Sequence, residues 1–68
     1  MIEITYYYNY SEGNWRQVTQ KFHDWHKAFR FMFVLKKSPK MVFLSITGDD
    51  KYEVDLIRRK TGVDKWVR

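Results

Sequence analysis

One amphipathic segment, residues 24–37, constrains the fold of this chain more than any other feature. Asp24 is a natural helix N-cap, because its carboxylate can accept hydrogen bonds from the free amides of a first turn. The segment ends in Lys36 and Lys37, which suit the negative end of a helix dipole, and Pro39 then stops the helix. Between these signals, apolar residues recur at helical spacing: Trp25, Ala28, Phe29, Met32 and Leu35.

The apolar side of this predicted helix is unusually wide. Together with Phe31 and Phe33, the apolar residues cover an arc of roughly 200°, about twice the stripe that a helix needs to pack on one sheet. This predicts either a helix deep in the concave face of a twisted sheet, or a flank that meets a second copy of the chain. We expect Phe31, Phe33 and Phe43 to contribute to an interaction surface.

Alternating stretches on both sides of the helix predict β-strands. Residues 2–9 alternate, and the turn cluster 11–14 leads into residues 15–22, which we interpret as a second strand. Residues 15–22 also fit helical spacing, so a single helix over 15–37 is the alternative. After the helix, residues 41–47 and 52–57 alternate on either side of a Gly-Asp-Asp turn, which predicts a second hairpin.

The predicted fold is therefore α+β with the order β-β-α-β-β. It is a four-stranded, mainly antiparallel sheet with one helix packed on one face. If residues 15–22 are helical, the order becomes β-α-β-β with a long helix. We expect one small domain over residues 1–60 and a basic C-terminal tail over 61–68.

Two further expectations concern surfaces and the C-terminal tail. The uncovered face of the predicted sheet is expected to show Tyr7 and Phe43. In the tail, Val63, Trp66 and Val67 are expected to form a short helical turn that packs back on the domain.

Composition excludes several classes of protein. The chain has 68 residues and no Cys, which excludes a disulfide-stapled miniprotein and a zinc-thiolate site. In place of such cross-links, the five Phe, five Tyr and three Trp residues can supply enough buried surface to stabilise so small a core. No apolar run approaches the ~18–20 residues of a membrane span, and the N-terminus does not read as a signal peptide. We expect a cytoplasmic protein that does not enter a membrane.

The sequence carries no recognised catalytic motif. His23, Asp24 and His26 have metal-ligand chemistry, but no further His and no Cys is present to complete a four-ligand set. The glycines are isolated, which is not the pattern of a phosphate-binding loop, and no Ser has a His near it in sequence. We therefore expect no enzyme activity, no metal site, no cofactor and no small-molecule substrate.

Basic and aromatic residues are the main functional signal. The net charge is +5, of which +4 lies in residues 36–68. Such asymmetry favours an anionic partner, either DNA or RNA, although a charge of this size also serves solubility alone. In the nucleic-acid interpretation the following residues contact phosphates: Arg58, Arg59, Lys60, Lys65 and Arg68. Tyr7 and Trp66 would stack on bases, and the alternative function is a homodimeric protein-interaction domain.

Three short segments carry a resemblance. They are the aromatic first strand Ile4-Thr5-Tyr6-Tyr7-Tyr8, then Phe22-His23-Asp24 leading into Ala28, and then Lys36-Lys37-Ser38. In these features the chain resembles small uncharacterised proteins of Gram-positive phages and mobile elements. The resemblance implies an accessory, non-enzymatic role and assigns no site residue.

Overall fold

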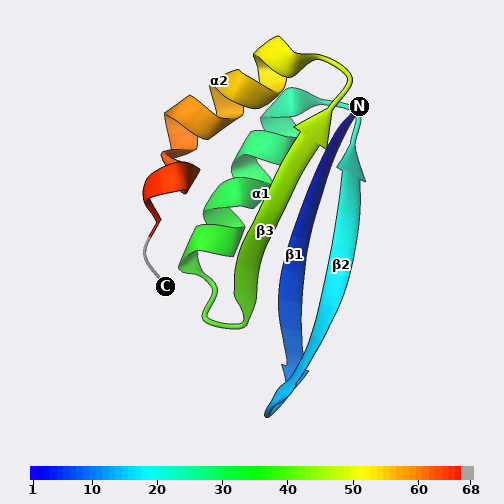
Figure 1. The fold of residues 1–68 in the computed structure, drawn as a ribbon, viewed down its shortest axis with the longest axis vertical. Coiled ribbons are helices and arrows are strands. Elements are labelled where there is room, and N and C mark those ends of the chain that lie inside the picture. Colours follow the sequence, from blue (N-terminus) through cyan, green and yellow to red (C-terminus); the bar gives the residue numbers. More distant parts are fainter. Residues whose placement is uncertain (67–68) are drawn as a thin grey trace.

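The computed structural model describes residues 1–66, which form a three-stranded sheet and two α-helices (Figure 1). The elements follow the order β1 (Ile2–Ser11), β2 (Asn14–Phe22), α1 (Trp25–Lys37), β3 (Met41–Gly48), α2 (Lys51–Thr61) and the short 3-10 helix η1 (Val63–Lys65). The strand order is β2-β1-β3 and both pairings are antiparallel. This confirms an α+β protein with an antiparallel sheet. Neither helix is long and apolar enough to cross a membrane.

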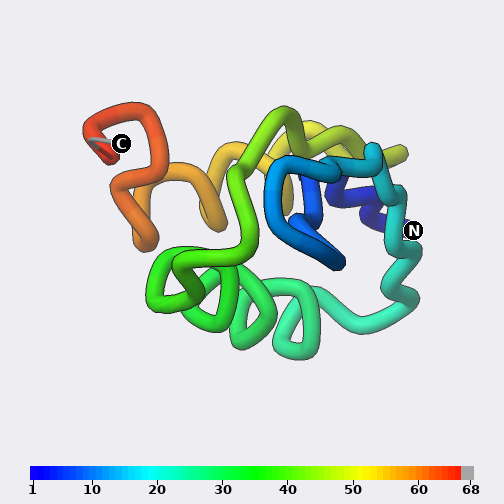
Figure 2. The backbone as a smooth tube through the Cα atoms, turned by 90° about the horizontal axis from the view of Figure 1, so that it is seen from below, coloured from blue at the N-terminus to red at the C-terminus, as the bar shows by residue number. Residues whose placement is uncertain are grey.

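Helix α1 lies across one face of the sheet. Helix α2 lies beside β3, where it packs against both β3 and α1 (Figures 1 and 2). The core forms where these elements meet. Central strand β1 contributes every second residue to it, because successive strand residues point to opposite faces. The buried apolar residues of the whole core are Ile2, Ile4, Tyr6, Ala28, Met32, Leu35, Ile46, Ile57 and Val63.

The second strand is confirmed, and the alternative of one long helix over 15–37 is wrong. Strand β2 pairs with β1 along almost its whole length, and the turn between them contains Gly13 at a φ of 78°, a conformation that favours glycine. The hydroxyls of Thr5 and Thr19, a cross-strand pair, are 3.0 Å apart. The turn therefore lets two β-prone segments pair directly, which outweighs the helical spacing of Trp15, Val18 and Phe22.

The predicted start of α1 is confirmed. The Asp24 carboxylate accepts a hydrogen bond from the His26 amide at 3.0 Å, as an N-cap does. The sheet and α2 cover most of the wide apolar arc of α1. On the sheet side, the Phe31 ring lies 5.3 Å from both the Tyr6 and Phe22 rings, and α2 also packs against α1. Phe33 stays 37% exposed and stacks edge-on against Phe29.

The predicted fourth strand over 52–57 is wrong, because these residues belong to α2. Asp50 acts as an N-cap, and its carboxylate accepts bonds from the amides of Tyr52 and Glu53. Alternation of apolar residues suggested a strand, yet Tyr52 is 72% exposed and the buried positions are Ile57 and Thr61, four apart. Helical spacing, not alternation, therefore describes which side of this segment packs.

A β-bulge in β3 overturns the prediction that Phe43 lies beside Tyr7 on the uncovered face. Thr5 pairs with Ser45, but the next residue of β1, Tyr6, pairs with Phe43, so Leu44 has no partner in the register. Phe43 therefore shares the face of buried Tyr6, and Val42 takes the position opposite Tyr7.

The C-terminal segment packs on the domain as far as it is described. Gly62 ends α2 in the left-handed conformation, at a φ of 65°, and η1 follows. Val63 is buried and Trp66 is partly buried against the core, which is the helical turn expected from the sequence. Val67 and Arg68 lie outside the described residues.

The cap at Asp50 gives the first testable prediction. Replacing Asp50 with Ala removes the acceptor for two free amides and should lower the free energy of unfolding by about 1 kcal/mol. Asp50→Asn should retain most of that stability. The neighbouring Asp49 is the matched control: its ion pair with the N-terminal amine is solvent-exposed, so Asp49→Ala should change stability by less than about 0.5 kcal/mol. Urea unfolding followed by circular dichroism measures all three variants, and equal losses at both positions would contradict the cap.

A second prediction concerns Gly48, which lets α2 approach β3 closely. A Cβ added here would lie 2.8 Å from Val54 Cγ2 and 3.1 Å from the Met1 carbonyl oxygen. Gly48→Ala should therefore destabilise the fold by about 1–3 kcal/mol through overpacking. Combining it with Val54→Ala should cost less than the sum of the single changes, because the first clash is removed. Strict additivity in thermal unfolding would show that the two residues do not meet.

Candidate functional site

The face of the sheet opposite α1 carries two exposed aromatic rings. Tyr7 is 37% exposed and Trp15 is 46% exposed. Together with Val42 they line a shallow hollow of about 290 Å³, which we call the open-face shelf. In the sheet register Tyr7 is opposite Val42, and Trp15 is opposite Asn9, two residues further along β1. The shelf therefore joins all three strands at one end of the sheet.

The sequence identified only part of this shelf. The alternation predicts Tyr7 on the uncovered face, and this is confirmed: Tyr6 is buried and Tyr7 is exposed. Trp15 was missed as a site residue because its segment, interpreted as a strand, also fitted helical spacing. The turn alone could not have placed it: with Ser11 opposite Asn14, a regular ladder would pair Trp15 with Tyr10, and only the register shift between Asn9 and Ser11 moves Trp15 to the face of Tyr7.

Exposed lysines lie in or just after the last turns of α1 and α2. The last turns of α1 and α2, the connection between α1 and β3, and η1 carry the exposed residues Lys36, Lys37, Lys40, Lys60 and Lys65, which we call the basic end. None of these lysines forms an ion pair within residues 1–66. The Lys40 carbonyl accepts a hydrogen bond from the Asn9 amide at 2.8 Å, so this lysine lies beside the strand that carries Tyr7.

Two of the arginines predicted to contact phosphates, unlike these lysines, form ion pairs within residues 1–66. Arg58 donates a 2.6 Å hydrogen bond to the Asp64 carboxylate, and Arg59 is paired with Asp55 one helical turn away. Exposed pairs of this kind are weak, so an anion can still compete for the guanidinium groups, but the nearby carboxylates lower their attraction for phosphate. Arg68 lies outside the described residues.

Trp66 packs against other residues and does not share a surface with Tyr7. Its indole nitrogen donates to the Thr61 carbonyl oxygen at 3.0 Å, and its ring meets Phe43 edge-on at 5.9 Å. Phe43 belongs to the face of the sheet that carries Tyr6, so Tyr7 and Trp66 lie on opposite sides of the sheet. The Lys36 amine lies 5.9 Å from the Trp66 ring, which ties the C-terminal segment to the end of α1.

His26 and Asp24, which have metal-ligand chemistry, make other contacts in the structure. Asp24 is engaged as a cap, and the ring of His26 stacks on Trp25 at 4.1 Å. Over residues 1–66, no group of three or more His, Asp or Glu side chains is placed to hold a metal ion.

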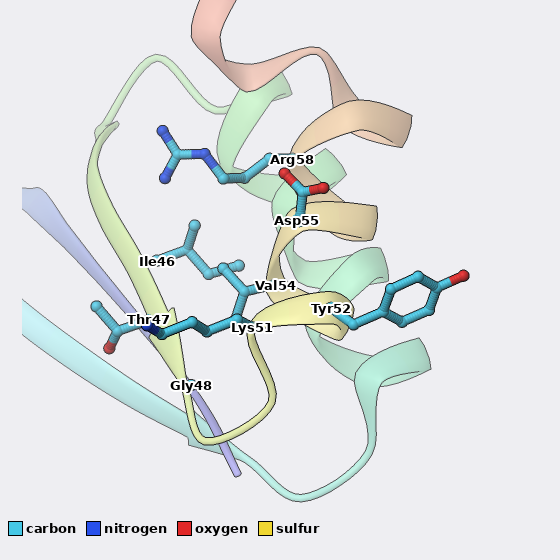
Figure 3. A pocket seen from close by; sticks show the side chains of 8 residues that line it. All are labelled: Ile46, Thr47, Gly48, Lys51, Tyr52, Val54, Asp55 and Arg58. Atoms are coloured by element: carbon cyan, nitrogen blue, oxygen red, sulfur yellow. The ribbon is translucent and has the colours of Figure 1, made fainter.

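A larger hollow, of about 620 Å³, lies between β3 and α2 (Figure 3). It is a groove lined by the residues Ile46, Thr47, Gly48, Lys51, Tyr52, Val54, Asp55 and Arg58. The sequence did not predict this groove, because it predicted a paired strand where α2 stands.

Comparison with known proteins assigns this chain to no family. Protein-family models, curated proteins and solved structures were all searched, and none matches this chain.

The different surroundings of Trp15 and Trp66 give a third prediction. Trp66→Ala should destabilise the fold by about 2 kcal/mol, because it removes the contact with Phe43 and the hydrogen bond to Thr61. Trp66→Phe keeps a ring and should cost about 1 kcal/mol. Trp15→Ala is the matched exposed change and should cost less than about 1 kcal/mol. Urea unfolding of the three variants decides between packing and surface roles, and a larger loss at Trp15 would refute this assignment.

Proposed function

We propose that this protein is a non-enzymatic module that binds single-stranded nucleic acid. One observation carries the proposal: the exposed rings of Tyr7 and Trp15 share an uncovered sheet face, and exposed Lys40 lies beside the strand that carries Tyr7. Proteins that bind single strands combine these two elements, because bases stack on aromatic rings while cations neutralise the phosphates. The net charge of +5 agrees with such a partner.

The proposed contacts differ from the purely sequence-based set. Tyr7 keeps its role as a stacking residue, and Trp15 takes the role assigned to Trp66, because Trp66 is engaged in packing. Lys60 and Lys65 keep their phosphate role and are joined by Lys36, Lys37 and Lys40. The resemblance to small phage and mobile-element proteins supports an accessory role for this binding.

The test is fluorescence anisotropy with a labelled single strand of about 15 nucleotides, as DNA and as RNA, with the matching duplex for comparison. Binding should weaken steeply between about 50 mM and 200 mM salt, because each neutralised phosphate releases counterion. Single strands should bind more tightly than the duplex. Absence of binding at low salt, or a preference for duplex, would reject the proposal.

Variants separate the two parts of the interface. Trp15→Ala should weaken binding about tenfold, since stacking contributes roughly 1–3 kcal/mol per base. Lys37→Gln combined with Lys40→Gln should reduce the salt dependence by about 1.4 in logarithmic slope, at about 0.7 per phosphate contact. The matched controls are Tyr52→Ala, an exposed ring on α2, and Lys27→Gln, an exposed lysine in the first turn of α1. Equal losses in the controls would show that only general charge and hydrophobicity matter.

Homodimerisation is a second candidate, favoured by one specific observation. Phe33 and Val34 are adjacent in α1 and are 37% and 51% exposed, which is a small apolar patch among exposed residues of the helix that are otherwise polar or basic. Such patches favour association. Light scattering after size exclusion should then give a dimer mass that Val34→Lys converts to a monomer mass. A monomer mass for the unchanged protein at high concentration would reject the dimer.

A further inference from the structure

The groove between β3 and α2 has an unpaired strand edge as one wall. In the order β2-β1-β3, strand β3 pairs only with β1, so its other edge faces α2. The Asp49 amide bonds to the Met1 carbonyl oxygen, which marks that position as a hydrogen-bonded pair of the β1–β3 ladder. Because such pairs alternate in an antiparallel ladder, the backbone groups of Gly48 and Ile46 point away from β1. Both residues line the groove.

The other wall presents two cations over an apolar floor. Figure 3 shows the Lys51 and Arg58 side chains reaching from α2 toward β3, on either side of Ile46 and Val54, while Tyr52 points away. Lys51 forms no ion pair within the described part of the chain. Arg58 donates one hydrogen bond to Asp64, and its guanidinium has further N–H donors. Among residues 1–66, Asp55 is the one carboxylate that lines the groove, and it is paired with Arg59. The groove is therefore apolar in the middle, with the Lys51 amine toward one end and the Arg58 guanidinium, next to Asp55, toward the other.

From this arrangement we propose that the groove binds an extended acidic peptide, which adds to the edge of β3 as a fourth strand. Backbone groups of the peptide would pair with those of Ile46 and Gly48, the usual source of affinity in strand addition. Paired N–H and C=O groups on the edge are what distinguish a peptide from other anions. The proposal is independent of the nucleic-acid function, because it uses neither the open-face shelf nor the basic end.

The spacing of the cations specifies the peptide further. Lys51 and Arg58 are seven positions apart on α2, which corresponds to roughly 10.5 Å along a helix axis. In an extended peptide, every second side chain lies on the same face, and residues four apart are separated by roughly 13 Å. Long cationic side chains bridge that small difference. The groove therefore fits the pattern Glu-x-Val-x-Glu, with valine over Ile46 and Val54 and a glutamate near each cation.

The probe is a fluorescein-labelled peptide, Thr-Glu-Thr-Val-Thr-Glu-Thr, added to the complete protein. It should bind saturably, and replacing both of its glutamates with lysines should abolish binding. A peptide N-methylated on the backbone amides that face β3 should also fail to bind, because it cannot pair with the edge. Amide hydrogen exchange at Ile46 and Gly48 should slow when the unmodified peptide is bound. Equal binding of the N-methylated peptide, or unchanged exchange, would overturn strand addition.

Protein variants locate the site. Lys51→Glu should weaken peptide binding about tenfold, whereas Lys51→Arg should bind within about twofold of the original protein. Lys60→Glu makes the same charge change on the same helix outside the groove lining, and it should leave peptide binding unchanged. Equal losses from Lys51→Glu and Lys60→Glu would reduce the effect to general electrostatics and overturn the proposal.

Two further measurements separate this proposal from its rivals. Trp15→Ala should leave peptide binding unchanged, so the peptide site and the nucleic-acid site can fail independently. If Ile46 and Gly48 are protected from exchange without peptide, and the protein has the mass of a dimer, then a second copy occupies the edge and the peptide proposal is overturned. If the cations only shield the edge from aggregation, the peptide will not bind and Lys51→Glu will self-associate.

Discussion

The buried row of Ile2, Ile4 and Tyr6 on central strand β1 is the constraint on which the rest of the structure depends. Side chains alternate along a strand, so burying this row under α1 forces the intervening residues onto the opposite face. With no disulfide available, the row is sealed by apolar and aromatic neighbours, among them the Phe31 ring against Tyr6. The exposure of Tyr7 is thus a consequence of the burial of Tyr6. The open-face shelf exists because one helix can cover only one face of the sheet.

The passage from β3 into α2 decides the shape of the other side of the molecule. Gly48 lacks the side chain that would collide with Val54, and Asp50 satisfies the first free amides of α2. The chain therefore turns from strand to helix within a few residues and returns alongside β3. A helix has no outward backbone groups to pair with a strand edge, since its own hydrogen bonds use them. For this reason α2 stands beside β3 and leaves the groove open.

Strand β3 links the two proposed surfaces. Its residue Val42 lies on the open-face shelf, while Ile46 faces the core and the groove. Without a bulge these two residues would share a face, because they are an even number of positions apart. The extra residue at Leu44 reverses the alternation, so one strand serves both surfaces. The same bulge directs Phe43 to Trp66, which attaches the C-terminal segment to the domain.

Local signals allowed the sequence alone to determine α1 with its Asp24 cap, strands β1 and β3, and the outward side of Tyr7, and to favour a strand over residues 15–22. Helix caps and the alternation of a strand depend on a few consecutive residues, so they can be recognised without knowing the tertiary contacts. Only the tertiary structure decided that residues 52–57 are helical and that Phe43 faces the core. At 50–57 two local patterns compete, and the burial of Ile57 against neighbouring elements decides between them. The bulge, the packed Trp66 and the groove likewise depend on contacts between segments far apart in the chain, which no local pattern encodes.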